Sequence, residues 1–192
     1  FNSFAKDYEL NVFEVDGCFD IGYFWDYINV NLFVLKTFLS SEIPIRLLDD
    51  VYVSNSSIIH KTASVENSCI ENSYIGPNSN IGPYSIIKNS VVEGWNNVKF
   101  SEVESSVMLK GSNAPHYNYV GDSVVCENVN LGAGTKLANI RFDKKNVKVE
   151  TMKGMVDSGR EKLGSCIGAD TKSGVNVSVN CGVLIAPGSY II

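Results

Sequence analysis

Few side chains in this sequence can do chemistry near neutral pH, and His116 has the most suitable surroundings. The chain of 192 residues has two histidines, His60 and His116, and five cysteines. An imidazole titrates near neutrality, so His116 could take a proton from an attacking amine. It lies in segment 111–122, which is rich in glycine, asparagine and tyrosine, and a solvated loop histidine is the plainer alternative.

The cysteines give no sign of a disulfide framework or a zinc knuckle. They are odd in number, widely spaced and without a C-x-x-C pair, which predicts a reducing, cytoplasmic compartment and small buried thiols. The two histidines are too few for a three-histidine zinc site within one chain, so a zinc enzyme is a weak alternative. The five positions are Cys18, Cys69, Cys126, Cys166 and Cys181.

An apolar repeat of six residues must position these side chains. Branched residues recur at this period from Val53 to Val98 with one slip, resume at Val125 and continue to Ile191. A helix with 3.6 residues per turn would spread them around its surface, whereas a prism of short strands turns them all inward. Small residues four positions later should also face the interior, among them Cys69, Ser79, Ser85, Val129 and Thr135.

The other segments do not follow this repeat. Residues 110–119 and 139–163 interrupt it, and interruptions of a solenoid are where a binding face is usually built. Residues 1–50 differ in composition, with a strand predicted over Tyr8–Val15, a turn over Gly17–Gly22, and a helix from the spacing of apolar residues between Trp25 and Leu39. We therefore expect two parts, residues 1–50 and residues 51–192.

Composition excludes several classes of protein. The net charge is -5 and no basic stripe is present, so we expect no nucleic-acid partner. No uninterrupted apolar run approaches the roughly 20 residues that span a bilayer, so we expect no membrane partner either. The start at Phe1 and the stop inside a repeat lead us to expect a piece of a longer protein.

Three segments carry a resemblance to a known family: GSNAPHYNYVGD (111–122), NLGAGT (130–135) and ANIRFD (138–143). In this order they resemble the acetyltransferase half of bifunctional sugar-1-phosphate nucleotidylyltransferase/acetyltransferases, archaeal type. The resemblance implies a mainly β fold, a left-handed parallel β-helix with about 18 residues per coil. It also implies acetyl transfer from acetyl-coenzyme A to the amine of glucosamine-1-phosphate or galactosamine-1-phosphate, in a homotrimer with sites between prisms.

Carried over position by position, this resemblance makes His116 the general base and Asn139 a second catalytic residue, which orients the amine and touches the acetyl donor. Tyr119 and Asn130 would contact the amino-sugar phosphate, with packing and a turn as the alternatives. The residues implied beside the acetyl-coenzyme A arm, mainly through their backbones, are Ala133, Asn139, Ile140, Ala169 and Pro187.

Basic residues beyond these motifs have two interpretations. Lys145 and Lys148 would attract the phosphates of the sugar or of coenzyme A, or form a solvated basic loop, and the same holds for Arg160 and Lys162. Two departures from the family leave the phosphate affinity and the sugar preference open: Glu104 and Asn113 stand where many relatives have lysines. A non-catalytic trimerisation or regulatory β-helix attached to a nucleotidylyltransferase is therefore the alternative function.

Residues 15–26 resemble the end of a sugar nucleotidylyltransferase domain, a short α+β remnant in which Asp20 matches an aspartate that helps to bind catalytic magnesium. One carboxylate is not enough, because Mg²⁺ also needs further oxygen ligands and the nucleotide phosphates. We therefore expect no nucleotidyl transfer from this chain. In the intact parent, the other domain would join the acetylated sugar phosphate to UTP.

Overall fold

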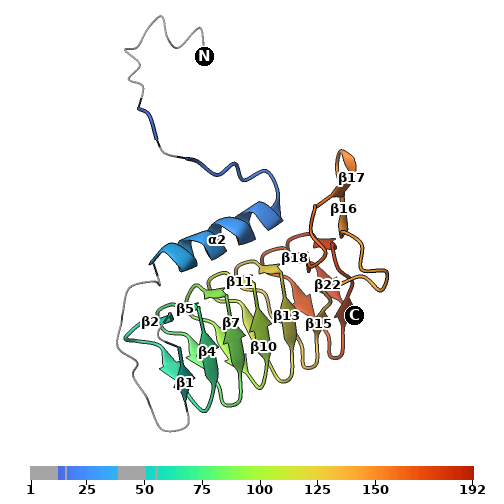
Figure 1. The fold of residues 1–192 in the computed structure, drawn as a ribbon. Coiled ribbons are helices and arrows are strands. Elements are labelled where there is room, and N and C mark those ends of the chain that lie inside the picture. Colours follow the sequence, from blue (N-terminus) through green and yellow to red (C-terminus); the bar gives the residue numbers. More distant parts are fainter. Residues whose placement is uncertain (1–12, 16, 39–50, 55) are drawn as a thin grey trace, which may run out of the picture.

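The computed structural model describes residues 13–15, 17–38, 51–54 and 56–192. The chain winds into a three-sided prism of short parallel strands, a parallel β-helix, and α2 (Phe24–Phe38) lies along one side of it (Figure 1). The mainly β solenoid predicted from the repeat is confirmed. Of the predicted strand Tyr8–Val15, residues 8–12 lie outside the described residues, and residues 13–15 are not in a strand.

Each face of the prism is a parallel sheet in which a strand pairs with its equivalent one coil later. The first face consists of β1 (Tyr52–Val53), β4 (Cys69–Glu71), β7 (Ile86–Lys88), β10 (Glu102–Glu104), β13 (Tyr119–Gly121), β15 (Lys136–Leu137) and β20 (Ser178–Val179). The second face consists of β2 (Ile58–Ile59), β5 (Tyr74–Ile75), β8 (Val91–Val92), β11 (Val107–Met108), β14 (Val124–Val125), β18 (Cys166–Ile167) and β21 (Leu184–Ile185). The third face consists of β3 (Ser64–Val65), β6 (Asn80–Ile81), β9 (Asn97–Lys99), β12 (Asn113–Pro115), a bridge at Asn130, β19 (Lys172–Ser173) and β22 (Tyr190–Ile191).

Three edges join these faces, and each is named here after one of its residues. The His116 edge joins the third face to the first, the Asp122 edge joins the first to the second, and the Ala169 edge joins the second to the third.

The interior is a column of branched side chains, with Ile75, Ile81 and Ile87 fully buried. Coils are shorter than the resemblance implied over most of the prism: Tyr52 pairs with Cys69 and Ser64 with Asn80, which are 17 and 16 residues apart. The implied length of 18 residues is reached only in the last coils, where Cys166 pairs with Leu184 and Lys172 with Tyr190.

The expected interruption over residues 110–119 is wrong. β12 and β13 continue the third and first faces there, and Ala114 and Val120 are fully buried in the core. Some neighbouring inward residues are five positions apart, as Val98 and Val103 are, so a strict period of six did not detect the repeat here. The same kind of step makes the prediction for Cys69 wrong, because Ile70 takes the inward position and Cys69 is only half-buried.

Serines explain the short steps at the Asp122 edge. Ser73, Ser90, Ser106 and Ser123 each donate their hydroxyl to the carbonyl two residues earlier, at 2.6–2.7 Å. Each hydroxyl also accepts the backbone N–H of the serine in the next coil, at 3.0–3.1 Å. Buried hydroxyls need such partners. The residue before each serine has a positive φ, and this column comprises Asn72, Asn89, Ser105 and Asp122.

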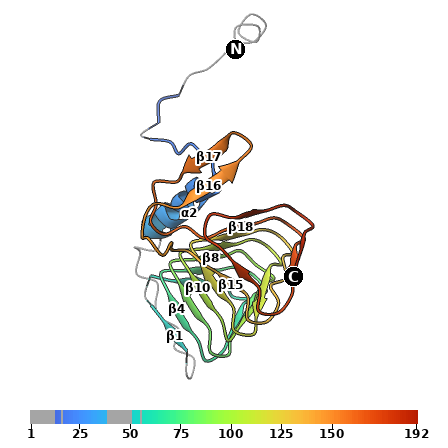
Figure 2. The same cartoon turned by 90° about the vertical axis from the view of Figure 1, so that its right-hand side faces the viewer.

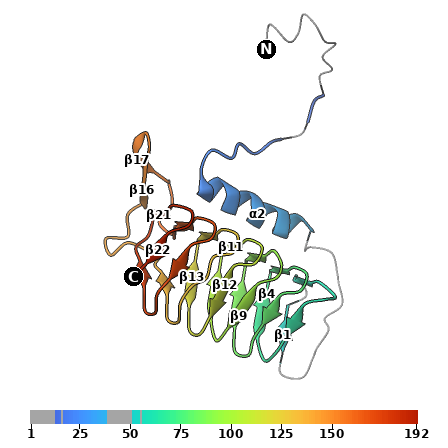
Figure 3. The same ribbon diagram turned by 180° about the vertical axis from the view of Figure 1, so that it is seen from behind.

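The second predicted interruption, residues 139–163, is confirmed. It leaves the prism at the Asp122 edge and contains an antiparallel hairpin of β16 (Lys148–Thr151) and β17 (Gly154–Asp157), which stands beside α2 (Figures 2 and 3). The predicted helix is also confirmed. It buries Trp25 and Ile28 in a second cluster with Val124 of the second face and with Val149 and Leu163 of the excursion.

Within the described part of the chain, no helix combines the length and the apolar character that a membrane crossing requires.

Candidate functional site

His116 lies on an edge with unusual backbone geometry. His116 and Tyr117 have φ values of 68° and 64°, and no other two consecutive non-glycine residues of the described chain both have positive φ. Such conformations cost about 1–3 kcal/mol each and often occur at functional sites. The His116 N–H donates to Lys99 O at 2.9 Å, and His116 O accepts the Gly134 N–H at 2.8 Å. The backbone is therefore fixed, while the imidazole is exposed.

Two other predicted residues flank this edge. The bond from Gly134 places Ala133 beside His116 on the next coil, and the Ala133 N–H donates to no described residue. Asn130 is exposed on the third face, in line with Asn113. The edge thus joins an imidazole, an available backbone N–H and a carboxamide.

Tyr119 connects this edge to the next one. It points outward from β13, and its hydroxyl accepts a hydrogen bond from Asn139 Nδ2 at 3.1 Å. Gly121 makes room for the contact, because a Cβ there would lie 2.7 Å from both Tyr119 Oη and Asn139 Nδ2. Burial, and then the nearby Glu104 carboxylate, raises the pKa of Tyr119, so the phenol stays protonated.

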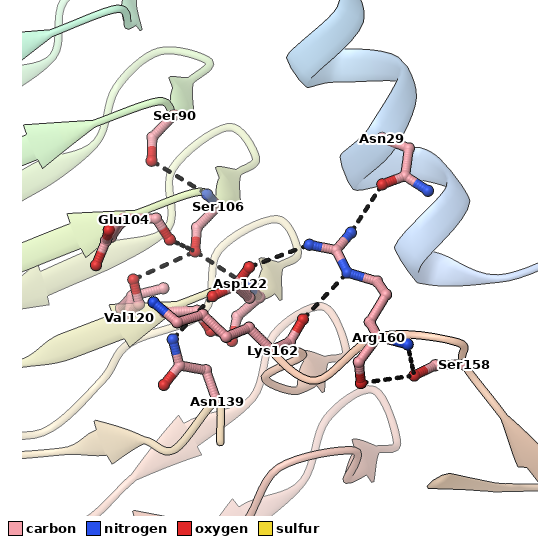
Figure 4. Close-up of polar contacts among 12 residues, drawn as sticks. Asn29, Ser90, Glu104, Ser106, Val120, Asp122, Asn139, Ser158, Arg160 and Lys162 are labelled. Carbon is pink, nitrogen blue, oxygen red and sulfur yellow. Dashed lines mark hydrogen bonds and ion pairs between the residues drawn. The ribbon is translucent and has the colours of Figure 1, made fainter. Parts of the chain in front are cut away.

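Asp122 completes a polar network that the sequence did not predict (Figure 4). Its Oδ2 accepts a second hydrogen bond from Asn139 Nδ2 at 2.8 Å, and its Oδ1 forms an ion pair with Arg160 at 3.1 Å. Arg160 also donates to Asn29 Oδ1 of α2 at 2.8 Å. Burial raises the pKa of Asp122, against the opposing effects of Asn139 and Arg160. Arg160 is thus paired within the chain, which does not favour its predicted interpretation as a free phosphate ligand.

One feature of the sequence could have indicated Asp122. The equivalent turn positions of earlier coils hold Asn72, Asn89 and Ser105, which are uncharged, so the turn itself does not require a carboxylate. A carboxylate at this position therefore indicates a role other than forming the turn.

The predicted residues are distributed over all three edges. Asn139 and Ile140 lie at the Asp122 edge, where the excursion begins. Ala169 and Pro187 lie on successive coils of the Ala169 edge, and the Gly188 N–H donates to Ala169 O at 2.7 Å. His116 and Ala133 lie on the remaining edge. A prism with a packed core cannot bring its three edges together, so one chain does not unite these groups.

The lysines of the excursion are apart from His116. Lys148 is exposed on β16, and the Lys145 N–H donates to Asp143 Oδ1 at 3.3 Å. No hydrogen bond or ion pair within the described residues joins either side chain to the three edges.

Glu104 and Asn113, which stand where many relatives have lysines, have different surroundings. Glu104 lies close enough to Tyr119 to raise its pKa, which puts negative charge beside the phenol. Asn113 is engaged with the backbone: its Oδ1 accepts the Asn97 N–H at 3.0 Å, and its Nδ2 donates to Gly111 O at 2.9 Å.

The structure also shows an aromatic column beside His116 that was not predicted from the sequence. The rings of Tyr84, Phe100 and Tyr117 follow one another on successive coils, with centroids 5.5 Å apart. They line a shallow groove with Tyr119 and Lys136, whose ammonium donates to Tyr117 O. The missed five-residue steps concealed this column, because its members are 16 and 17 residues apart.

Asp20 is exposed in the segment before α2. No cluster of three potential metal ligands occurs among the residues that the structure describes, so they do not fit a magnesium site.

Comparison with known proteins defines the relatives of this chain, although no family model matches it. It is 39% identical over 204 residues to a bifunctional sugar-1-phosphate nucleotidylyltransferase/acetyltransferase of Sulfurisphaera tokodaii, covering 98% of this chain and 48% of that protein. It is 34% identical over 180 residues to the bifunctional protein GlmU of Methanocaldococcus jannaschii, covering 90% and 43%. The chain spans about half the length of these relatives.

A solved structure of a Bacillus cereus protein described as a putative acetyltransferase aligns with 74% of this chain and 78% of its own, at 13% identity and a TM-score of 0.47.

The fold and the relatives together define the class of this chain: a parallel β-helix related to about half the length of the bifunctional nucleotidylyltransferase/acetyltransferases. More narrowly, the resemblance predicted from the three motifs is confirmed: over nearly its whole length, this chain is a GlmU-like relative of the bifunctional sugar-1-phosphate nucleotidylyltransferase/acetyltransferases.

Proposed function

We propose that this chain transfers the acetyl group of acetyl-coenzyme A to the amine of glucosamine-1-phosphate or galactosamine-1-phosphate. The observation that carries the proposal is the His116 edge, where an exposed imidazole on a rigid backbone adjoins the available Ala133 N–H. The relative from Sulfurisphaera tokodaii, whose name includes acetyltransferase, supports acyl transfer. The choice of amino sugar rests on the motifs alone.

In the proposed reaction, the amine nitrogen attacks the thioester carbonyl, and His116 takes the proton that the nitrogen loses. The carbonyl oxygen becomes an oxyanion, which the Ala133 N–H can stabilise. When the oxyanion collapses, the C–S bond breaks, and the imidazolium returns its proton to the departing thiolate. The balance is one amide and one thiol from one amine and one thioester, without a covalent enzyme intermediate.

A second copy of the chain must complete the site if Ala169 and Pro187 hold the donor, because they lie on a different edge from His116. We propose a homotrimer in which edges of neighbouring prisms face each other. Lys145 and Lys148 are exposed on the excursion and would supply positive charge to phosphates bound between copies. In the intact protein, a nucleotidylyltransferase domain would join the product to UTP.

The test is thiol release from acetyl-coenzyme A, with either sugar phosphate, by the wild type and His116→Ala. We expect the variant to lose about a hundredfold or more in kcat, which is the usual contribution of a general base. His60→Ala is the matched control, because His60 lies on an early coil and, among the residues that the structure describes, its ring forms hydrogen bonds with Thr62 alone, at 2.9 and 3.2 Å.

Absence of release from a folded wild-type protein with both sugars would contradict the proposal. It would favour the alternative of a non-catalytic trimerisation or regulatory β-helix, with which the negative charge of Glu104 beside Tyr119 is compatible.

A further inference from the structure

The Asn139 carboxamide is held in one orientation. Its Nδ2 carries two hydrogens, and both are donated: one to Tyr119 Oη at 3.1 Å and one to Asp122 Oδ2 at 2.8 Å. An ionised carboxylate can only accept hydrogen bonds, so the nitrogen, and not the oxygen, must face Asp122. Asn139 is 8% exposed, which leaves little room for another arrangement.

The oxygen of this carboxamide is left available. Asn139 Oδ1 forms no hydrogen bond with any residue that the structure describes, and Figure 4 shows it pointing away from Asp122. A carbonyl oxygen in this position can accept an N–H of a bound amine. That hydrogen bond would strengthen as the amine nitrogen gains positive charge during attack on a thioester.

Asp122 is itself fixed from two further elements. Arg160 of the excursion pairs with its Oδ1 at 3.1 Å, and the same guanidinium donates to Lys162 O at 3.1 Å and to Asn29 Oδ1 of α2 at 2.8 Å. Asp122 is 5% exposed, so the carboxylate has lost most of its water and depends on these partners.

We infer that Asp122 is a positioning residue for acetyl transfer: through Arg160 and Asn29 it is anchored to the excursion and α2, and it holds the Asn139 carboxamide with its oxygen toward the acceptor amine. This inference rests on the proposed function. Asp122 touches no reacting atom, so its effect must pass through Asn139.

The test compares Asp122→Asn with the matched control Glu71→Gln in the intact protein. Both changes replace a carboxylate by its amide on coils of the same prism, and Glu71 forms a partly exposed ion pair with Lys88 at 3.0 Å. Asparagine already occupies the equivalent turn at Asn72 and Asn89, so the Asp122 variant should fold. We expect kcat to fall about tenfold to a hundredfold in Asp122→Asn, with a much smaller change in KM for acetyl-coenzyme A and no effect of Glu71→Gln.

A double-mutant cycle separates positioning from a merely structural role. If Asp122 acts only through Asn139, Asp122→Asn should not lower kcat further in an Asn139→Ala background. Independent, multiplicative losses in the two variants would overturn the inference, as would an unchanged kcat in Asp122→Asn.

A measurement that needs no activity distinguishes the inference from the proposed function. The side-chain amide resonances of Asn139, assigned by their loss in Asn139→Ala, should show two hydrogen-bonded hydrogens in the wild type and a large shift in Asp122→Asn. Unshifted resonances would refute the inference even in an active enzyme. No acetyl transfer by the wild type, with the resonances as expected, would refute the proposed function and the catalytic part of the inference, and leave only the orientation of the carboxamide.

Discussion

At the residue scale, Asp122 is a buried carboxylate whose burial opposes its ionisation, although its neighbours partly offset this effect. Asp122 stands at a turn where asparagine would serve, and its environment opposes ionisation even though Asn139 and Arg160 favour it. A residue whose ionised form is destabilised by folding, and which the backbone conformation does not require, is typical of a functional position.

The pH dependence of stability tests whether burial raises the pKa of Asp122. Its pKa is raised on folding above the ordinary value of about 3.9, because burial outweighs the hydrogen bond from Asn139 and the charges of Arg160 and Lys162, and Glu104 adds to the increase. A raised pKa contributes stability that is fully present below the unfolded pKa and is lost as the pH rises through the folded pKa. The free energy of unfolding of the wild type, minus that of Asp122→Asn, should therefore be largest in acid and fall toward neutral pH.

Urea unfolding of both proteins at several pH values measures that difference. A difference that grew with rising pH would mean that the ion pair with Arg160 outweighs burial, contrary to this expectation.

At the scale of elements, Gly121 and Gly132 lie next to the site but make room for different neighbours: side chains at Gly121 and backbone at Gly132. The atoms nearest to a Cβ on Gly121 would be the ends of the Tyr119 and Asn139 side chains, at 2.7 Å. A Cβ on Gly132 would meet the backbone, with Gly174 O at 2.2 Å and Ser173 O at 2.7 Å. Side-chain ends can move aside, whereas stacked coils cannot separate without losing their hydrogen bonds.

Gly121→Ala should therefore reduce activity more than stability, and Gly132→Ala should do the reverse. We expect Gly121→Ala to lower kcat/KM for acetyl transfer about tenfold or more, because Tyr119 and Asn139 are displaced, with the melting temperature nearly unchanged. For Gly132→Ala we expect a loss of about 1–3 kcal/mol in the free energy of unfolding from overpacking. Enzyme assays and thermal unfolding of both variants check this, and an active Gly121→Ala protein would contradict it.

At the scale of the whole molecule, the three edges decide how a site can be assembled. His116 and Ala169 lie on different edges of one packed prism, so a single chain cannot bring them to one acetyl donor. If both residues serve the same reaction, they must come from different copies.

Mixing two inactive variants tests this arrangement. His116→Ala lacks the base, and Ala169→Trp should block the donor with a bulky side chain on the other edge. After joint unfolding and refolding of equal amounts, about a quarter of the sites in random trimers would combine an intact His116 with an intact Ala169, so about that share of wild-type activity should return. Each variant refolded alone should stay inactive. Mixed trimers without recovered activity would argue against a shared site.

The sequence by itself determined the periodic part of this protein. Branched residues at short, regular steps specify a column of inward side chains, and the spacing of Trp25, Ile28 and Leu35 specifies α2, because both patterns depend on neighbours along the chain. The excursion at 139–163 was also predictable, since it breaks the period. The motif around His116 was found only through its resemblance to a family.

Only the tertiary structure decided the rest. Five-residue steps at serine-lined edges brought residues 110–119 back into the prism, and no fixed period could show this. Arg160 pairs with Asp122 and Asn29, which lie 38 and 131 positions before it in the sequence, and this depends on how the excursion folds back onto α2. Local patterns carry information about which side chains face inward. The contacts that orient Asn139 come from Tyr119 and Asp122 on the preceding coil, and Arg160 of the excursion holds Asp122 in turn, so they form only after the coils have stacked.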